Sequence, residues 1–176
     1  MFTVDKKFPD FSLPAYFPER GDDGRVSLAD FSGKWLILFW YPADFTFVCP
    51  TELADLGQRL EEYRALGAEI VGASTDTVYT HKGWVDHEEL LHDLKFPLAA
   101  DHSGAFSREL GIYAATYALS RFVTPGFQAI ASFVLVKGRD GSLRERRHIL
   151  KHGVLYGLGL SLAAWNAEQG QLQANS

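Results

Sequence analysis

The chain has little that would cross-link it covalently or place it in a membrane. Its 176 residues include one cysteine, Cys49, which excludes an intrachain disulfide and any zinc site built on several cysteines. No apolar run is long enough to span a bilayer, and residues 1–8 lack the apolar segment of a secretory signal, so we expect neither feature. The net charge is −5, and basic residues gather only at Arg144, Arg146 and Arg147, so nucleic acid is not an expected partner.

The length fits one domain with a substantial core, and the sequence has no internal repeat, linker or low-complexity segment. Residues 1–176 are therefore predicted to form a single domain. His87 and His92 lie in a segment of helical periodicity, but their spacing rotates the second side chain by about 140° from the first. A zinc-binding helix places both histidines on one face, so this pair predicts a solvated helix face, and no metal or other cofactor is expected.

The chain is organised around one central stretch, residues 35–53. Its first part, residues 35–41, is an unbroken apolar run that predicts a strand buried on both faces. Pro42 ends this strand because proline cannot donate to a sheet ladder, and Pro50 suits the first turn of a helix that Gly67 stops. The apolar positions of that helix are Leu53, Leu56, Leu60 and Tyr63.

Cys49 falls where the intervening loop becomes the first turn of the helix. Free backbone N–H groups and the positive end of the helix dipole favour an anion there, so the position predicts a lowered thiol pKa. The alternative is that a lone cysteine is a small buried apolar residue. We favour the reactive thiol, because Cys49 stands at a helix start and follows Thr46 by three residues.

A second apolar run, residues 68–73, follows the helix. Strand, helix and strand at this spacing predict a βαβ unit, in which the two strands are parallel and adjacent. The second strand leads into the polar residues Ser74-Thr75-Asp76-Thr77. Because sites in open α/β sheets lie at the carboxyl ends of parallel strands, we expect Cys49 and residues 74–76 at one edge of the sheet.

The other elements follow from periodicity and turn signals, and they predict an α/β protein. The expected elements are extended segments at 9–13 and 96–98, turns at 21–24 and 139–142, helices at 80–94, 105–110 and 154–167, and antiparallel strands at 131–136 and 143–150.

Pro42, Thr46 and Cys49 fit a Pro-x-x-x-Thr-x-x-Cys signature, and in this the chain resembles the peroxiredoxins. The longer string over residues 39–52, FWYPADFTFVCPTE, is similar to the AhpC/Prx1 subgroup, and the resemblance extends over residues 9–136. The resemblance implies a thioredoxin-like α/β fold with a mixed central β-sheet flanked by helices. It also implies a thiol-dependent peroxidase that reduces hydrogen peroxide or organic hydroperoxides through a cysteine sulfenic acid.

The same resemblance implies a role for each residue of the signature. Cys49 would be the nucleophile that attacks the peroxide, Thr46 would place its hydroxyl near the sulfur, and Pro42 would shield the pocket. A helix cap for Thr46 and a strand terminator for Pro42 are structural alternatives that are compatible with these roles. Glu52 would join a polar network around a catalytic arginine, and Trp84 would pack near the site.

That arginine marks the first departure from the subgroup. Its position is occupied by Ile130, and a second family arginine, which follows a glycine, is replaced by Val154. Either Arg121, in a lengthened segment 113–125, substitutes as the donor, or the site lacks one. A redox sensor or interaction protein with little peroxidase turnover is therefore the alternative function.

The second departure is the missing resolving cysteine of the subgroup. It implies that the sulfenic acid is reduced by an external thiol or dithiol, which fits the cytoplasm because thiols stay reduced there. The strand at 143–150 has no cleanly apolar face, which is typical of a sheet edge, and the subgroup pairs such strands across a two-fold axis. We therefore expect a homodimer, with a decamer through the apolar Phe45 and Phe47 as the larger alternative.

Overall fold

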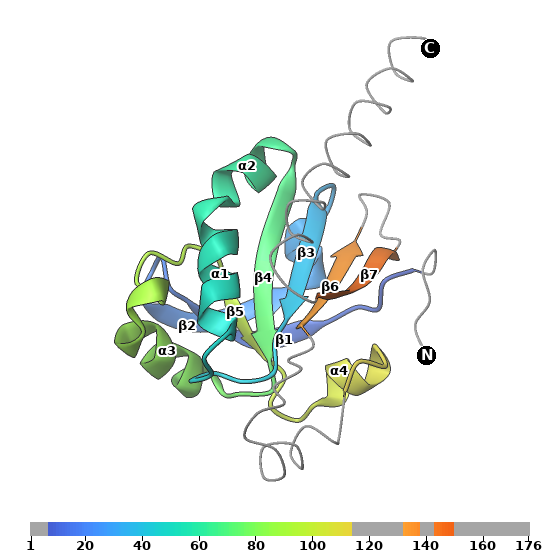
Figure 1. Cartoon of the computed structure of the whole chain (residues 1–176). Helices are drawn as coiled ribbons and strands as arrows, with labels where there is room; N and C mark the ends of the chain where they lie inside the picture. Colours follow the sequence, from blue (N-terminus) through green and yellow to red (C-terminus); the bar gives the residue numbers. More distant parts are fainter. Residues whose placement is uncertain (1–6, 114–131, 138–142, 150–176) are drawn as a thin grey trace.

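The apolar run of the central stretch forms strand β3 (Trp35–Trp40), and all of its residues are buried. It pairs in parallel with β4 (Ala68–Ser74), and Trp40 lies beside Ala73, so the two strands end at the same level. The chain between them contains the helix that begins at Cys49, as Figure 1 shows. The predicted βαβ unit is confirmed.

The computed structural model describes residues 7–113, 132–137 and 143–149. For residues 132–137 and 143–149 it describes the backbone alone. The other strands are β1 (Ser12–Phe17), β2 (Asp22–Ser27), β5 (Leu98–Ala100), β6 (Ser132–Lys137) and β7 (Leu143–Ile149). The helices are α1 (Cys49–Gln58), α2 (Leu60–Ala65), α3 (Val78–His87) and α4 (Ala105–Glu109), with single 3₁₀ turns η1 (Leu28–Phe31) and η2 (Glu89–Leu91).

The described strands form one mixed sheet in the order β2-β1-β5-β4-β3-β6-β7. β3, β4 and β5 are parallel, whereas the pairs β1–β2, β1–β5, β3–β6 and β6–β7 are antiparallel. β3 and β4 are therefore central strands, flanked on both sides. β7 lies at the end of the sheet, as its residue pattern predicts.

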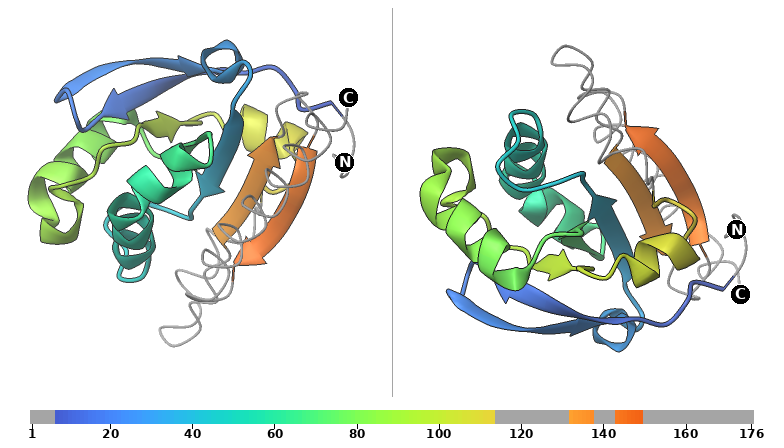
Figure 2. Two further views of the ribbon diagram at one scale, coloured as in Figure 1. Left: turned by 90° about the horizontal axis from the view of Figure 1, so that it is seen from above. Right: turned by 90° about the horizontal axis from the view of Figure 1, so that it is seen from below.

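Alternate side chains of β3 enter two separate cores, one on each face of the sheet. Ile37 and Phe39 pack with residues of α1, α2 and α3. Leu36 and Leu38 pack with Phe106 of α4 and with residues that precede β3. Figure 2 shows the same division, with α1, α2 and α3 on one side of the sheet and α4 on the other. Both faces of β3 are covered, which explains why its sequence is apolar throughout.

The prediction for the N-terminal region placed the turn too far along the chain. A turn was expected at residues 21–24, but Asp22 already begins β2, which forms a hairpin with β1. Gly21 closes this hairpin by adopting a left-handed conformation with φ of 70° and donating its N–H to the carbonyl of Phe17. The acidic pair after Gly21 suggested a turn, yet β2 is an edge strand on which charged side chains are tolerated.

The helix expected over residues 80–94 begins earlier and is shorter than predicted. Thr77 caps α3 by accepting a hydrogen bond from the Thr80 N–H, and the helix ends at His87. Glu88 is extended, and its side chain accepts from the Leu90 N–H, which starts η2 instead of another α-helical turn.

The helix after Cys49, expected to continue until Gly67, is divided at Arg59. Gly57, a poor helix former, lies two residues before this break. The strands predicted over 131–136 and 143–150 are confirmed as β6 and β7. The turn at 139–142, the helix at 154–167, Arg121, Ile130 and Val154 lie outside the described residues. In the part of the chain that is described, no helix has the length and hydrophobicity required to cross a membrane.

Candidate active site

The candidate site is built on the loop of residues 41–48, which connects β3 to α1. The Tyr41 N–H donates to the Ala73 carbonyl at 3.0 Å, so the loop starts from the carboxyl ends of β3 and β4. It ends at Cys49, the first residue of α1, whose side chain is fully buried. Pro50 follows in the first helical turn, where its missing N–H has no helical acceptor to lose. The predicted position of Cys49 at a helix start is confirmed.

The structure brings Thr46 and Cys49 together. The Thr46 hydroxyl donates to the Ala43 carbonyl at 2.9 Å within the loop. The Thr46 side chain and the backbone at Ala43 and Cys49 each favour the thiolate and lower the thiol pKa. Pro42 is half-buried at the start of the same loop, so all three residues of the signature lie on this one segment.

Burial decides the ionisation of Cys49. The pKa of the thiol is raised from 9.0 to about 11, chiefly by desolvation, which exceeds the opposing effect of the Thr46 side chain. The Glu52 carboxylate also contributes to this rise. A lowered thiol pKa was expected from the helix dipole, and that expectation was wrong in direction. Burial costs the thiolate more solvation energy than the helix dipole provides in stabilisation.

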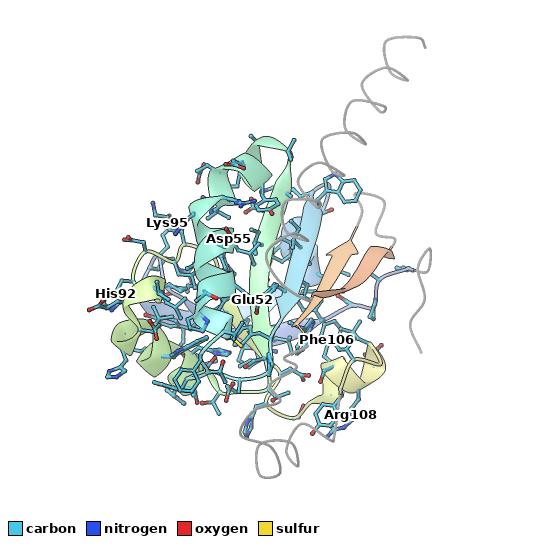
Figure 3. All side chains as sticks on the ribbon, viewed as in Figure 1. Glu52, Asp55, His92, Lys95, Phe106 and Arg108 are labelled. Carbon is cyan, nitrogen blue, oxygen red and sulfur yellow. The ribbon has the colours of Figure 1, made fainter. Side chains whose placement is uncertain are left out.

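Among the described residues, the groups with the largest effects on the Cys49 pKa include no cation. Arg121, the one candidate that the sequence offered as a substitute, lies outside the described part of the chain. Glu52, labelled in Figure 3, is buried on the half of α1 nearest to the loop. Within the described residues, this site combines a protonated thiol with a nearby carboxylate and several neutral hydrogen-bond donors.

Trp84 of α3 packs beside the loop, as the resemblance implied. Its ring centroid lies 5.6 Å from that of Tyr41 and 6.4 Å from that of Phe45, and its side chain is buried. Asp76, which follows β4, accepts a hydrogen bond from the Asp44 N–H at 2.8 Å. The predicted meeting of residues 74–76 with the Cys49 loop at one sheet edge is therefore confirmed.

A buried polar network under the loop was missed by the sequence analysis. The Tyr41 hydroxyl donates to Asp44 Oδ1 at 2.8 Å, and Asp44 Oδ2 lies 2.7 Å from Nδ1 of His81. The second ring nitrogen of His81, Nε2, lies 3.2 Å from the Ala99 carbonyl oxygen. Two signals pointed to it, namely an aspartate inside an aromatic string and a histidine three residues before Trp84 on one helix face.

The arrangement is suited to chemistry at sulfur. Among the described residues, no group of three or more potential ligands could hold a metal ion. The buried thiol has hydrogen-bond donors on its loop, and it lies at the carboxyl end of β3, where sites of α/β sheets are found. A thiolate formed here would be oriented and partly stabilised by these donors.

Comparisons with known proteins agree with this description. A sequence model of the AhpC/TSA family matches residues 4–139. YkuU of Bacillus subtilis (strain 168), named as a peroxiredoxin, is 44% identical over 114 residues, which is 62% of this chain and 63% of that protein. Alkyl hydroperoxide reductase C of Staphylococcus epidermidis is 36% identical over 112 residues, which is 64% of this chain and 59% of the relative. The match thus spans about three-fifths of these curated relatives.

The fold can be compared over a longer range. The crystal structure of AhpC from Enterococcus faecalis superposes with a TM-score of 0.78 at 32% sequence identity and covers 97% of both chains. The thioredoxin-like α/β fold with a mixed central sheet, expected from the sequence, is confirmed by this agreement.

Proposed function

Because the chain belongs to the AhpC/TSA family of peroxiredoxins, we propose that it is a thiol-dependent peroxidase with Cys49 as its nucleophile. The observation that carries the proposal is the joint placement of Cys49 and Thr46 on one loop, where the Thr46 side chain favours the thiolate. The proposed substrates are hydrogen peroxide and small organic hydroperoxides. Pro42 shields the thiol at the start of the loop in this proposal.

The proposed reaction begins when the Cys49 thiolate attacks one oxygen of the peroxide. The new S–O bond forms as the O–O bond breaks, and the other oxygen leaves as water or an alcohol after it takes up a proton. Cys49 is thereby oxidised to a sulfenic acid. The Thr46 hydroxyl and the loop N–H groups act by donating hydrogen bonds to the atoms that carry developing negative charge.

Return to the thiol requires an external reductant, because the chain has no second cysteine. A first external thiol attacks the sulfenic acid and releases water, which leaves a mixed disulfide. A second thiol group reduces that disulfide and regenerates Cys49. A dithiol can supply both groups. The reductant is therefore a thiol or dithiol of a reducing compartment, and we propose the cytoplasm.

A second candidate function follows from the raised pKa of Cys49, about 11. At neutral pH a thiol with this pKa is almost entirely protonated, and the thiolate is the reactive form. A protein in this state reacts slowly with peroxide and suits a redox sensor or interaction protein with little turnover. The measured rate of Cys49 oxidation separates the two functions.

The experiment is a competition assay at neutral pH, in which hydrogen peroxide is divided between the reduced protein and a reference peroxidase. For the peroxidase, the second-order rate constant should exceed that of a free thiol by several orders of magnitude, and mass spectrometry should find the sulfenic acid on Cys49. Cys49→Ser should consume no peroxide with a small-thiol reductant. A wild-type rate equal to that of a free thiol would reject the peroxidase and leave the sensor.

We also propose that the protein is a homo-oligomer. Two features support it. Among the described strands β7 is the last of the sheet, and no other described strand pairs with its outer edge, where a second copy could pair as in an isologous interface. Near the active-site loop, Phe47 is 85% exposed and Tyr79 is 82% exposed. Large apolar side chains with this exposure favour a further contact between dimers.

A further inference from the structure

The loop that carries Thr46 is held by contacts from outside it, and these contacts meet at Asp44. The Asp44 side chain binds Tyr41 and His81, and its backbone N–H donates to Asp76. The Asp76 carboxylate is itself fixed by the Ser74 hydroxyl, which donates to Oδ2 at 2.9 Å. Asp44 thus ties the loop to the exit of β4 and to α3, and it joins the loop's own first residue, Tyr41, to the same network.

The loop needs such a restraint because its backbone is locally unfavourable. Phe45 has φ of 55°, a left-handed conformation that costs a bulky residue on the order of 1–3 kcal/mol. Phe45 follows Asp44 directly, and its ring is largely exposed. The strained residue therefore borders the anchored one, and release of Asp44 would let the loop relax toward a different conformation.

The contact between Asp44 and His81 requires one shared proton. The Ala99 carbonyl can only accept a hydrogen bond, so Nε2 of His81 carries a hydrogen. Nδ1 faces the carboxylate at 2.7 Å, and both side chains are fully buried. With one proton between them, the pair is either imidazolium with carboxylate or imidazole with carboxylic acid. Without that proton, two lone pairs face each other in a buried site.

We propose that Asp44 and His81 form a proton-dependent latch, which keeps the active-site loop closed and Cys49 buried. They act as positioning residues, because Ala43 and Thr46, which flank Asp44 on the loop, favour the Cys49 thiolate. Only the consequence for turnover rests on the proposed function, namely that the latch controls when the Cys49 sulfenic acid meets an external thiol. The latch itself concerns the exposure of Cys49 and needs no peroxide.

The ionisable groups that face the pair act on the Asp44 carboxyl group. Burial raises the pKa of Tyr41 well above its ordinary value, so this hydroxyl stays a donor to Asp44. Burial also raises the pKa of Asp44, the His81 partner lowers it, and the Asp76 carboxylate raises it. Cys49 on α1 is protonated at neutral pH, Trp84 of α3 is uncharged, and β5 contributes the Ala99 carbonyl.

The latch predicts a definite pH dependence of Cys49 exposure. Exposure is measured by the labelling rate of Cys49 with a chromogenic disulfide reagent, divided by the rate for the denatured chain at the same pH. This ratio reports the opening equilibrium and removes the ionisation of the free thiol. The opening ratio should rise by up to about tenfold per pH unit over the range in which the opened loop has released this proton and the closed pair still holds it. It should level off once the closed pair has lost the proton as well.

Asp44→Asn is the decisive variant. Its amide oxygen can accept from Tyr41 while its amide N–H donates to Nδ1 of neutral His81, so the contacts persist without a shared proton. The opening ratio of Asp44→Asn should therefore stay constant over the pH range in which the ratio of the wild type rises. His81→Leu removes the latch and should increase opening on the order of 10²-fold at neutral pH. The matched control is His102→Leu, which changes an exposed histidine outside the network.

Two results would overturn the latch: a pH profile of Asp44→Asn that parallels the wild type, or a His81→Leu ratio equal to the wild type. If His81→Leu does not fold, the Asp44→Asn comparison decides alone. The labelling experiment contains no peroxide, so a negative result in the peroxidase assay would not contradict the latch. A negative result in the labelling experiment would likewise not contradict the oxidation of Cys49 by peroxide.

Discussion

The carboxylate of Glu52, one helical turn after Cys49, makes the Cys49 thiol harder to ionise. Both groups lie near the same helix N-terminus, whose partial positive charge corresponds to roughly half an elementary charge. Glu52 already provides a negative charge there, and a thiolate would add a second in a buried site. The helix end that suggests a reactive cysteine is therefore shared between two potential anions.

Glu52→Gln should lower the pKa of Cys49, because it removes the nearby negative charge while keeping the shape of the side chain. Titration of the thiolate by its ultraviolet absorbance measures the change. Glu61→Gln is the matched control, since Glu61 is an exposed residue of α2 paired with Arg64. An unchanged Cys49 pKa in Glu52→Gln would show that the two groups do not interact.

Thr46→Val should slow the reaction of Cys49 with hydrogen peroxide on the order of 10²–10³-fold, because one hydrogen-bond donor to the reacting atoms is lost. Thr46→Ser keeps the hydroxyl and should retain most of the rate. Stopped-flow oxidation of the reduced protein measures both variants, and circular dichroism checks the fold. A rate for Thr46→Val within about threefold of the wild type would remove the hydroxyl from the mechanism.

The raised thiol pKa predicts lower stability at alkaline pH. Between pH 9.0 and about 11, the unfolded thiol ionises while the folded thiol keeps its proton, so the free energy of unfolding falls as pH rises. By pH 10.5 this loss is about 2 kcal/mol. Tyr63, whose pKa burial raises to about 12, adds a loss of the same sign.

Cys49→Ser has no ionisable thiol and should show the smaller decline. Urea denaturation at several pH values measures the difference between the two proteins. Parallel stability curves above pH 9.0 would contradict a buried, protonated thiol.

Gly72→Ala should destabilise the protein by about 1–3 kcal/mol, because its new methyl would lie 2.7 Å from Leu98 Cδ2 on the adjacent strand. Gly83→Ala is the control, at an exposed position of α3 where nothing lies within 4 Å of the added carbon. That change should stabilise by up to about 1 kcal/mol, since glycine is a poor helix former. Urea denaturation compares both variants with the wild type, and equal stabilities for all three would refute the packing at Gly72.

Local patterns predicted the central part of the fold because each carries a direct physical cause. The apolar run at 35–41 requires burial on both faces, and Pro50 marks the start of α1. The end of α3 at His87 could not be predicted in this way, since there the Glu88 side chain accepts a hydrogen bond from the Leu90 N–H that competes with the helix. The same holds for the register of β2, which its partner β1 sets.

The site shows the same limit. The positions of Thr46 and Cys49 followed from the signature, whereas the pKa of Cys49 depends on how deeply the folded chain buries it. Asp44 and His81 are 37 residues apart, and only the three-dimensional structure brings them together. Hydrogen bonds between distant residues leave no periodicity in a sequence, so such networks escape pattern analysis.

The exposed Phe47 should carry the contact between dimers if the protein assembles beyond a dimer. Pairing through β7 alone gives about twice the chain mass of 19.6 kDa, and added contacts at the loop would give about ten times that mass. Light scattering of the reduced protein at micromolar concentration distinguishes these states. Phe47→Ser should return any larger assembly to the dimer mass, because it removes an apolar side chain that is 85% exposed. Leu90→Ser, at an exposed apolar residue of η2, should leave the mass unchanged, and a stable wild-type monomer would contradict both interfaces.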